Sequence, residues 1–297
     1  MKKTPWTYIP SLYLAEGLPY IIINTVSTVL YADLGFSNDK IAFWTGWLYL
    51  PWILKMFWSP LVDAKSTKRR WLLGAQTVLA GLFLLLAGLT AWEAFRFAQG
   101  NSSLTFFTLS LFSFLAGAFV SATLDIATDG YYLLALTPQE QSRFVGIRTI
   151  FYRLAMILGS GALVSATASL GNKTPGTSWN LVAWPYNWAV MFGFLGIMFL
   201  GFAFYHAWVL PKPGQDKPVQ KNGATAWADS FKTYFTQKNI VYILLFILLY
   251  RLGDALLEKM VPLFLLKPAA DGALGMSVQN YGLIKGTLGL GAVVAGD

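Results

Sequence analysis

The chain has 297 residues, of which 56% are hydrophobic and only 12% are charged. A soluble globular domain carries about twice this share of charged residues, so the composition excludes an ordinary soluble fold and predicts a polytopic membrane protein. The net charge of +8 does not indicate nucleic-acid binding, because the cations lie in short loops between apolar segments, as the positive-inside rule predicts. The absence of cysteine excludes disulfides and thiolate metal sites.

Apolar segments recur along the whole chain, and a helix of about 20 apolar residues crosses a hydrocarbon core of about 30 Å. The first segment is too long for a cleaved signal peptide and contains Glu16, so we expect it to remain in the mature protein. In chain order, we predict eight transmembrane helices at 7–31, 40–61, 71–92, 104–136, 144–168, 187–209, 239–266 and 278–297.

The loop between the second and third segments fixes the predicted orientation, because four cations lie in it and such loops stay on the cytoplasmic side. With the N-terminus inside, twelve cations fall in inner segments: Lys2, Lys3, Lys65, Lys68, Arg69, Arg70, Arg143, Lys212, Lys217, Lys221, Lys232 and Lys238. Four fall in outer loops: Lys40, Arg96, Lys173 and Lys267. This bias predicts a cytoplasmic N-terminus.

Residues 210–238 form the longest inner segment and divide the chain. We predict a six-helix half at 1–209 and the first two helices of a second half at 239–297. The segment opens with a linker rich in Pro and Lys. Trp227, Phe231 and Tyr234 then recur at helical spacing, which predicts a short amphipathic helix on the inner membrane surface, with an irregular loop as the alternative.

A short internal echo also indicates two halves. The sequence Leu-Gly-Phe-Ser at 34–37 follows the first predicted helix, and Leu-Gly-Met-Ser at 274–277 follows the seventh. Internal repeats are the usual construction of secondary transporters. If this repeat holds, twelve helices are expected and the second half is cut short in this sequence.

Ionisable residues inside the predicted helices are candidates for function, because a charge at bilayer depth is costly and must be compensated. Glu16 and Arg153 lie at similar depths in the first and fifth helices, and Gly17 and Pro19 weaken the first helix after Glu16. We expect these two to face one central cavity that carries the solute and the proton, together with three residues on one face of the seventh helix: Arg251, Asp254 and Glu258.

The chemistry of these groups leaves alternatives open. Arg251 and Asp254 are one turn apart and could simply neutralise each other. Glu16 has no cation in its own helix, which makes it the preferred proton carrier, although a carboxylate site also suits Na⁺.

Asp125 and Asp129 lie four residues apart and therefore on one face of the fourth helix. One interpretation makes them proton carriers. The favoured interpretation makes them a cytoplasmic gate, because several charged residues are expected at the same level: Lys55, Asp63, Arg69, Arg70, Arg143 and Arg148. We expect His206, the only histidine, at the inner interface without a special role.

Several stretches resemble the AmpG-type permeases, the muropeptide-permease branch of the major facilitator superfamily, which is related to acetyl-CoA transporters of the endoplasmic reticulum. They are LYLAEGLPY in the first helix, PWILKMFWSPLVD followed by RRWLLGAQ, DIATDGYYLLAL in the fourth and FYRLAMILGSGAL in the fifth. The resemblance implies the all-α fold of that superfamily and a bacterial inner-membrane carrier that imports anhydro-muropeptides with protons.

Residue by residue, the resemblance matches Asp63, Arg69 and Arg70 to the cytoplasmic loop of the family. It matches Asp125 and Asp129 to its paired aspartates, and Arg153 to its arginine in the fifth helix. Glu16 departs from the family, whose members often carry a small or amide residue there.

An enzyme is disfavoured, because the chain has one histidine, no cysteine and no glycine-rich phosphate loop. We therefore expect no catalytic residues, cofactor or metal. The expected partners are a small solute, protons and the lipid bilayer, with the protein a monomer. Two other interpretations remain, a carrier for another solute such as a sugar, a nucleotide or an acyl-CoA-like molecule, and a membrane sensor that does not transport.

Overall fold

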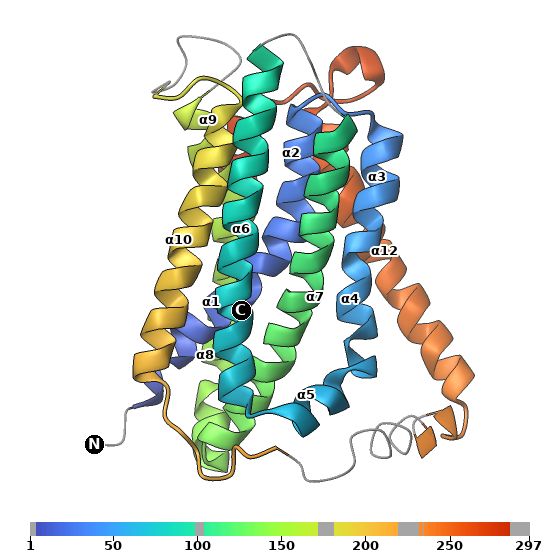
Figure 1. The fold of residues 1–297 in the computed structure, drawn as a ribbon. Helices are drawn as coiled ribbons and strands as arrows, with labels where there is room; N and C mark the ends of the chain where they lie inside the picture. The colour runs from blue at the N-terminus through green and yellow to red at the C-terminus, as the bar shows by residue number, and fades with distance from the viewer. Residues whose placement is uncertain (1–3, 99–103, 172–180, 219–231, 234, 286–297) are drawn as a thin grey trace.

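The computed structural model describes residues 4–98, 104–171, 181–218, 232–233 and 235–285. Every regular element in these ranges is a helix, which confirms the all-α prediction (Figure 1). We call the end of the molecule that carries the N-terminus the inner end, and the opposite end the outer end, after the orientation predicted from Lys and Arg.

The first predicted span is a continuous helical segment of three parts, α1 (Ile9–Ile21), the π-helical turn η2 (Ile22–Val26) and α2 (Ser27–Asp33). Gly17 of α1 brings this helix close to α8 (Pro138–Ile157). A Cβ added at Gly17 would lie 2.9 Å from both the carbonyl oxygen of Tyr152 and the Cβ of Ala155. Small residues allow this close approach between helices in a membrane.

The second predicted span is broken. The structure divides it into α3 (Asn38–Gly46), η3 (Trp47–Tyr49), α4 (Leu50–Leu54), η4 (Lys55–Phe57) and α5 (Ser59–Lys65). Pro51 and Pro60 stand in the first turns of α4 and α5, where a residue without an N–H is tolerated. Lys55 lies in the second of the two intervening turns of 3₁₀-helix, between α4 and α5.

The remaining helices of the first half are long. They are α6 (Lys68–Ala98), α7 (Leu104–Ala135), α8, which continues through η5 (Leu158–Leu163) into α9 (Val164–Leu170), and α10 (Tyr186–Val209). A capping box of Thr137 and Glu140 starts α8. In length and composition, four described segments are able to cross a membrane: Lys68–Arg96, Thr105–Ala135, Pro138–Leu170 and Tyr186–Val209. The total of eight spans stays a prediction.

The second half is represented by α12 (Ile240–Leu266), the turn η6 (Ala269–Asp271) and helical residues 278–285. Most of the predicted amphipathic helix, and the rest of the eighth span, lie outside the described residues. The division of the chain at 209 and 238 therefore stays a prediction.

The helices of the first half pack around a common core. α6 lies beside α10 and α7, and α1 lies against α8 and α7 (Figure 1). The core is rich in aromatic side chains, among them the fully buried Phe83, Phe114, Phe192 and Phe199. This packing fixes the positions of α1, α7 and α8, which carry most of the charged residues of the site.

The two tetrapeptides of the internal echo have the same local structure. Gly35 and Gly275 both adopt a positive φ, of 86° and 65°, which favours glycine. Ser37 and Ser277 each then accept, through the carbonyl oxygen, the first hydrogen bond of the following helix, from the amide nitrogens of Ile41 and Tyr281. The repeat read from sequence is thus matched by repeated backbone geometry.

Candidate functional site

Three carboxyl groups meet inside the first half. Glu16 of α1 and Asp125 and Asp129 of α7 each offer an oxygen, and these oxygens all lie within 4.8 Å of one another. Glu16 is buried, with 5% of its surface exposed. Among the described residues, its Oε2 atom meets no hydrogen-bond donor. We call these three residues the carboxylate cluster.

Two cations pair with the aspartates of the carboxylate cluster. Lys55 of η4 forms an ion pair with Asp125, and Arg148 of α8 places Nη1 3.4 Å from Oδ1 of Asp129. The broken second span positions Lys55, and Trp58 fastens that span to α7 by donating from Nε1 to Oγ1 of Thr123 at 3.1 Å. Three carboxylates and two cations leave one negative charge, which a proton or another monovalent cation would balance.

Two tyrosines frame Arg148. Its guanidinium carbon lies 5.2 Å from the ring centroid of Tyr13 on α1 and 5.2 Å from that of Tyr132 on α7. Tyr13 also donates a hydrogen bond to Oδ1 of Asp129 at 3.0 Å. These contacts hold the guanidinium and the Asp129 carboxylate in place from three helices.

The structure corrects the separation of Glu16 from the paired aspartates. The sequence placed Glu16 in a central pathway with Arg153 and assigned Asp125 and Asp129 to a cytoplasmic gate, but oxygens of all three carboxyl groups lie within 4.8 Å of one another. The chain runs outward in α1 and inward in α7, so counting residues from the start of each helix does not compare their depths. Both Glu16 and Asp129 lie about 10 Å from the inner ends of their helices at about 1.5 Å per residue.

The predicted gate residues Lys55, Asp125, Asp129 and Arg148 thus belong to the carboxylate cluster and its two cations. Of the other predicted gate residues, Arg143 is exposed on α8, and Asp63, Arg69 and Arg70 lie at the inner loop. Asp63 pairs with Lys68, whose side chain packs on Gly130 of α7, and Arg69 donates from Nη2 to the carbonyl oxygen of Ala207 on α10 at 2.5 Å. Arg70 is exposed.

Sequence reasoning missed Asp216, which reaches this loop from the segment after α10. Its carboxylate accepts from the backbone N–H groups of Lys68 and Arg69 at 2.7 and 3.1 Å. A carboxylate from a segment almost 150 residues away therefore caps the start of α6, where the helix dipole favours negative charge. A Pro-Gly-Gln-Asp stretch in a linker gives no local signal of such a role.

The predicted pathway residues beyond Glu16 are not brought to the carboxylate cluster by any described contact. Arg153 is exposed on α8 and lies about 140° around the helix from Arg148. Arg251, Asp254 and Glu258 lie on α12, but their side chains are outside the described part of the structure. Their place on the pathway stays a prediction.

The sequence model of the Major Facilitator Superfamily matches residues 11–296. The chain belongs to this superfamily. A structural comparison agrees, because the crystal structure of a D-xylose–proton symporter matches 96% of this chain and 65% of its own with a TM-score of 0.59. At 14% sequence identity that likeness concerns the fold alone.

Relatives with AmpG names confirm the resemblance read from the motifs. The chain is 26% identical over 292 residues to putative transporter AmpG 4 of Rickettsia conorii, covering 94% of this chain and 64% of that protein. It is 26% identical over 295 residues to the anhydromuropeptide permease of Escherichia coli K12, covering 95% and 52%. The chain therefore spans about half to two thirds of the length of these relatives.

In this superfamily member, the segment from Lys267 to residue 285 contacts the earlier helices at the outer end. Lys267, just after α12, donates from Nζ to the carbonyl oxygen of Phe36 at 2.7 Å. Residues 278–285 pack on η5 and α9 so closely that a Cβ added at Gly282 would lie 2.6 Å from the backbone nitrogen of Ser165. Toward the inner end, α12 diverges from α2 and α3, and Tyr242 is 75% exposed (Figure 1).

His206 corrects another expectation. The side chain is fully buried, not interfacial, and its two ring nitrogens lie 3.0 Å from Oγ of Ser11 and 3.0 Å from Oε1 of Gln76. The ring also stacks on Phe202. His206 therefore joins α10 to α1 and α6 by a buried polar network, which a single histidine in an apolar sequence does not reveal.

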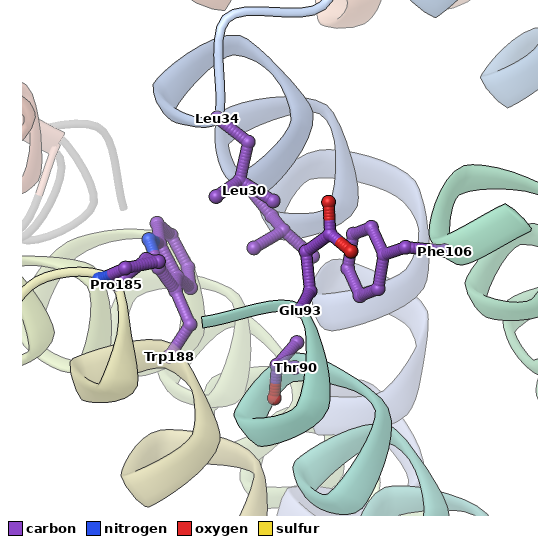
Figure 2. Close-up of a pocket in the computed structure, with 7 residues that line it drawn as sticks. All are labelled: Leu30, Leu34, Thr90, Glu93, Phe106, Pro185 and Trp188. Atoms are coloured by element: carbon purple, nitrogen blue, oxygen red, sulfur yellow. The ribbon is translucent and has the colours of Figure 1, made fainter. Parts of the chain in front are cut away.

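Glu93 is a second buried glutamate that sequence reasoning missed. It lies near the outer end of α6, with 3% of its surface exposed, in a site enclosed by aliphatic and aromatic side chains (Figure 2). The enclosed space has essentially no room for a water molecule. This setting suits a structural role and gives no path for a solute.

An apolar cavity of about 570 Å³ lies between α3–α4 and α7. Its lining is almost wholly aliphatic and aromatic, with Lys40 at the outer end. Sugar and peptide groups require several converging polar partners, so this cavity does not suit a sugar–peptide solute.

Proposed function

We propose that this chain is part of a secondary active transporter that imports cell-wall sugar–peptides of the anhydro-muropeptide type together with protons. The observation that carries the proposal is the carboxylate cluster, which keeps one negative charge unbalanced inside a membrane transporter fold. The names of the AmpG relatives suggest the solute class. Because those proteins are longer, the activity of the whole transporter is part of the proposal.

Glu16 is the proposed proton carrier. Asp125 and Asp129 each have a cation of their own, whereas Glu16 is buried and Oε2 meets no donor among the described residues. A buried carboxyl group beside two carboxylates is stabilised when it holds a proton, since desolvation and like-charge repulsion both disfavour its ionised form. Movement of that proton to one side of the membrane would couple the gradient to the solute.

The arrangement of the halves supports alternating access. Contacts at Lys267 and Gly282 join them at the outer end, while α12 stands away from the first half at the inner end. We propose that this is the inward-open state of a carrier in the bacterial inner membrane, with its N-terminus in the cytoplasm. Asp63, Arg69 and Arg70 would then close the inner side in the opposite state.

Uptake into vesicles tests the proposed function. The full-length protein, reconstituted and supplied with a labelled anhydro-muropeptide, is expected to accumulate it when the outside is more acidic, and to stop when an ionophore collapses the gradient. Accumulation driven by a sodium gradient alone would show that the cluster carries Na⁺. Failure to accumulate under either gradient would contradict ion-coupled import of this solute class.

A further inference from the structure

We propose that Arg148 binds an anionic group of the solute, and that this binding draws the coupling proton onto Glu16 of the carboxylate cluster. The inference rests on the proposed transport function and adds to it the charge of the solute and the step that links solute to proton. Two features of the site carry it, the open and weakly engaged guanidinium of Arg148, and the two other carboxyl groups beside its present partner.

Arg148 is accessible and only loosely paired. Its side chain is 33% exposed, and the 3.4 Å contact to Asp129 is longer than the roughly 2.7–2.9 Å of a strong charge-assisted hydrogen bond. A guanidinium has five N–H donors, and this contact uses one nitrogen. The group therefore retains the capacity to bind a second anion.

The two tyrosine rings around Arg148 favour an anion with two adjacent oxygens. The rings of Tyr13 and Tyr132 hold the guanidinium at 5.2 Å from each centroid, which limits its movement and preserves its forked geometry. A carboxylate or phosphate accepts two parallel hydrogen bonds from such a fork, whereas a neutral hydroxyl or amide does not. The site thus selects for charge and shape.

Displacement of Arg148 would change the net charge of the carboxylate cluster. Asp129 would lose one ion pair while remaining within 4.8 Å of two other carboxyl groups, and the added negative charge would favour uptake of a proton by Glu16 from water on the open side. One ion pair breaks and one forms, and one proton enters with each solute anion. The charged and titratable groups that face Asp129 are Glu16, Tyr13, Lys55, Asp125, Tyr132 and Arg148.

Calorimetry on the purified full-length protein in detergent tests this inference. The probes are a muramyl tripeptide with free carboxylates and the same compound with the carboxylates converted to amides. We expect the acid to bind about 10- to 100-fold more tightly than the amide. Titrations in buffers of different ionisation enthalpy should show about one proton taken up with the acid and about none with the amide.

Variants separate a binding role from a structural one. Arg148→Gln should abolish both the preference for the acid and the proton uptake, and Arg148→Lys should restore part of the preference, because it returns the charge without the fork. Arg96→Gln, which changes an arginine in the last turn of α6 at the outer end, is the control and should behave as the wild type.

Equal binding of acid and amide, no binding of the acid, or an Arg148→Gln variant that still prefers the acid would each overturn the inference. These results leave the transport function open, because uptake of either compound into vesicles measures that separately. Conversely, failure of uptake with a retained acid preference in detergent would contradict the transport proposal and spare the assignment of Arg148.

Discussion

Three carboxyl groups share one site with two cations, and each cation contacts an aspartate. Lys55 and Arg148 therefore compensate Asp125 and Asp129, which leaves Glu16 as the group whose charge depends on an outside ion. This division of roles assigns structural and coupling functions to residues of the same chemical type. It also makes the effect of removing a cation different from that of removing Glu16.

Lys55→Gln tests the division of roles at the level of one ion pair. The change leaves Asp125 without its cation beside two other carboxyl groups, so the variant should lose about 1 kcal/mol of stability, a value reduced by the partial exposure of Lys55. Thermal unfolding of the purified protein measures this. The double variant with Asp125→Asn should recover most of the loss, and additive losses would indicate that the two residues do not interact.

The charged residues of the site were largely predictable from the sequence, but their grouping was not. An ionisable residue within an apolar segment is a strong signal, and it identified Glu16, Asp125 and Asp129. Contacts between helices depend on which faces meet, and that information lies in close-packing residues such as Gly17. Measuring depth from the inner end of each helix, rather than along the chain, would have placed Glu16 beside Asp129.

At the scale of elements, the long helices follow hydropathy closely. The segments predicted at 104–136, 187–209 and 239–266 appear as Leu104–Ala135, Tyr186–Val209 and Ile240–Leu266. The second span differs, because hydropathy records its apolar length and not the breaks in its backbone. Pro51 and Pro60 signal those breaks, and Lys55, which pairs with Asp125, lies in one of the 3₁₀ turns between them.

The close packing of residues 278–285 on η5 and α9 at the outer end provides a prediction about conformational change. Gly282→Val adds a side chain where the backbone of residues 278–285 nearly touches that of Gly161 and Ser165, so it should disfavour closure of the outer side. Because the chain lacks cysteine, spin labels can be placed at Asp39→Cys and Ala270→Cys alone. Pulsed electron–electron double resonance should then show a population in which the two labels are farther apart.

Gly201→Val is the matched control for this close packing, since a Cβ at Gly201 meets nothing within 4 Å while the change in helix propensity is the same. It should leave the distance distribution unaltered. An unaltered distribution in Gly282→Val as well would show that this close approach does not hold the outer side closed.

At the scale of the whole molecule, the repeat connects the two halves. Positive-φ glycines at Gly35 and Gly275 open equivalent turns, and Lys267 of the second turn donates to the carbonyl oxygen of Phe36 in the first. The two loops that share a sequence pattern therefore also touch. Such contacts between related loops are suited to close one side of a carrier while the other side stands open.

We propose that Glu16 carries the coupling proton. Transport by the Glu16→Gln variant in proteoliposomes is the direct test of this role. The variant is isosteric and cannot ionise, so it should lose accumulation of labelled anhydro-muropeptide on a pH gradient. It should retain counterflow exchange between loaded vesicles, because that exchange needs no net proton movement. Glu93→Gln, the other buried glutamate, should retain both activities. Accumulation by Glu16→Gln on a pH gradient would contradict the claim.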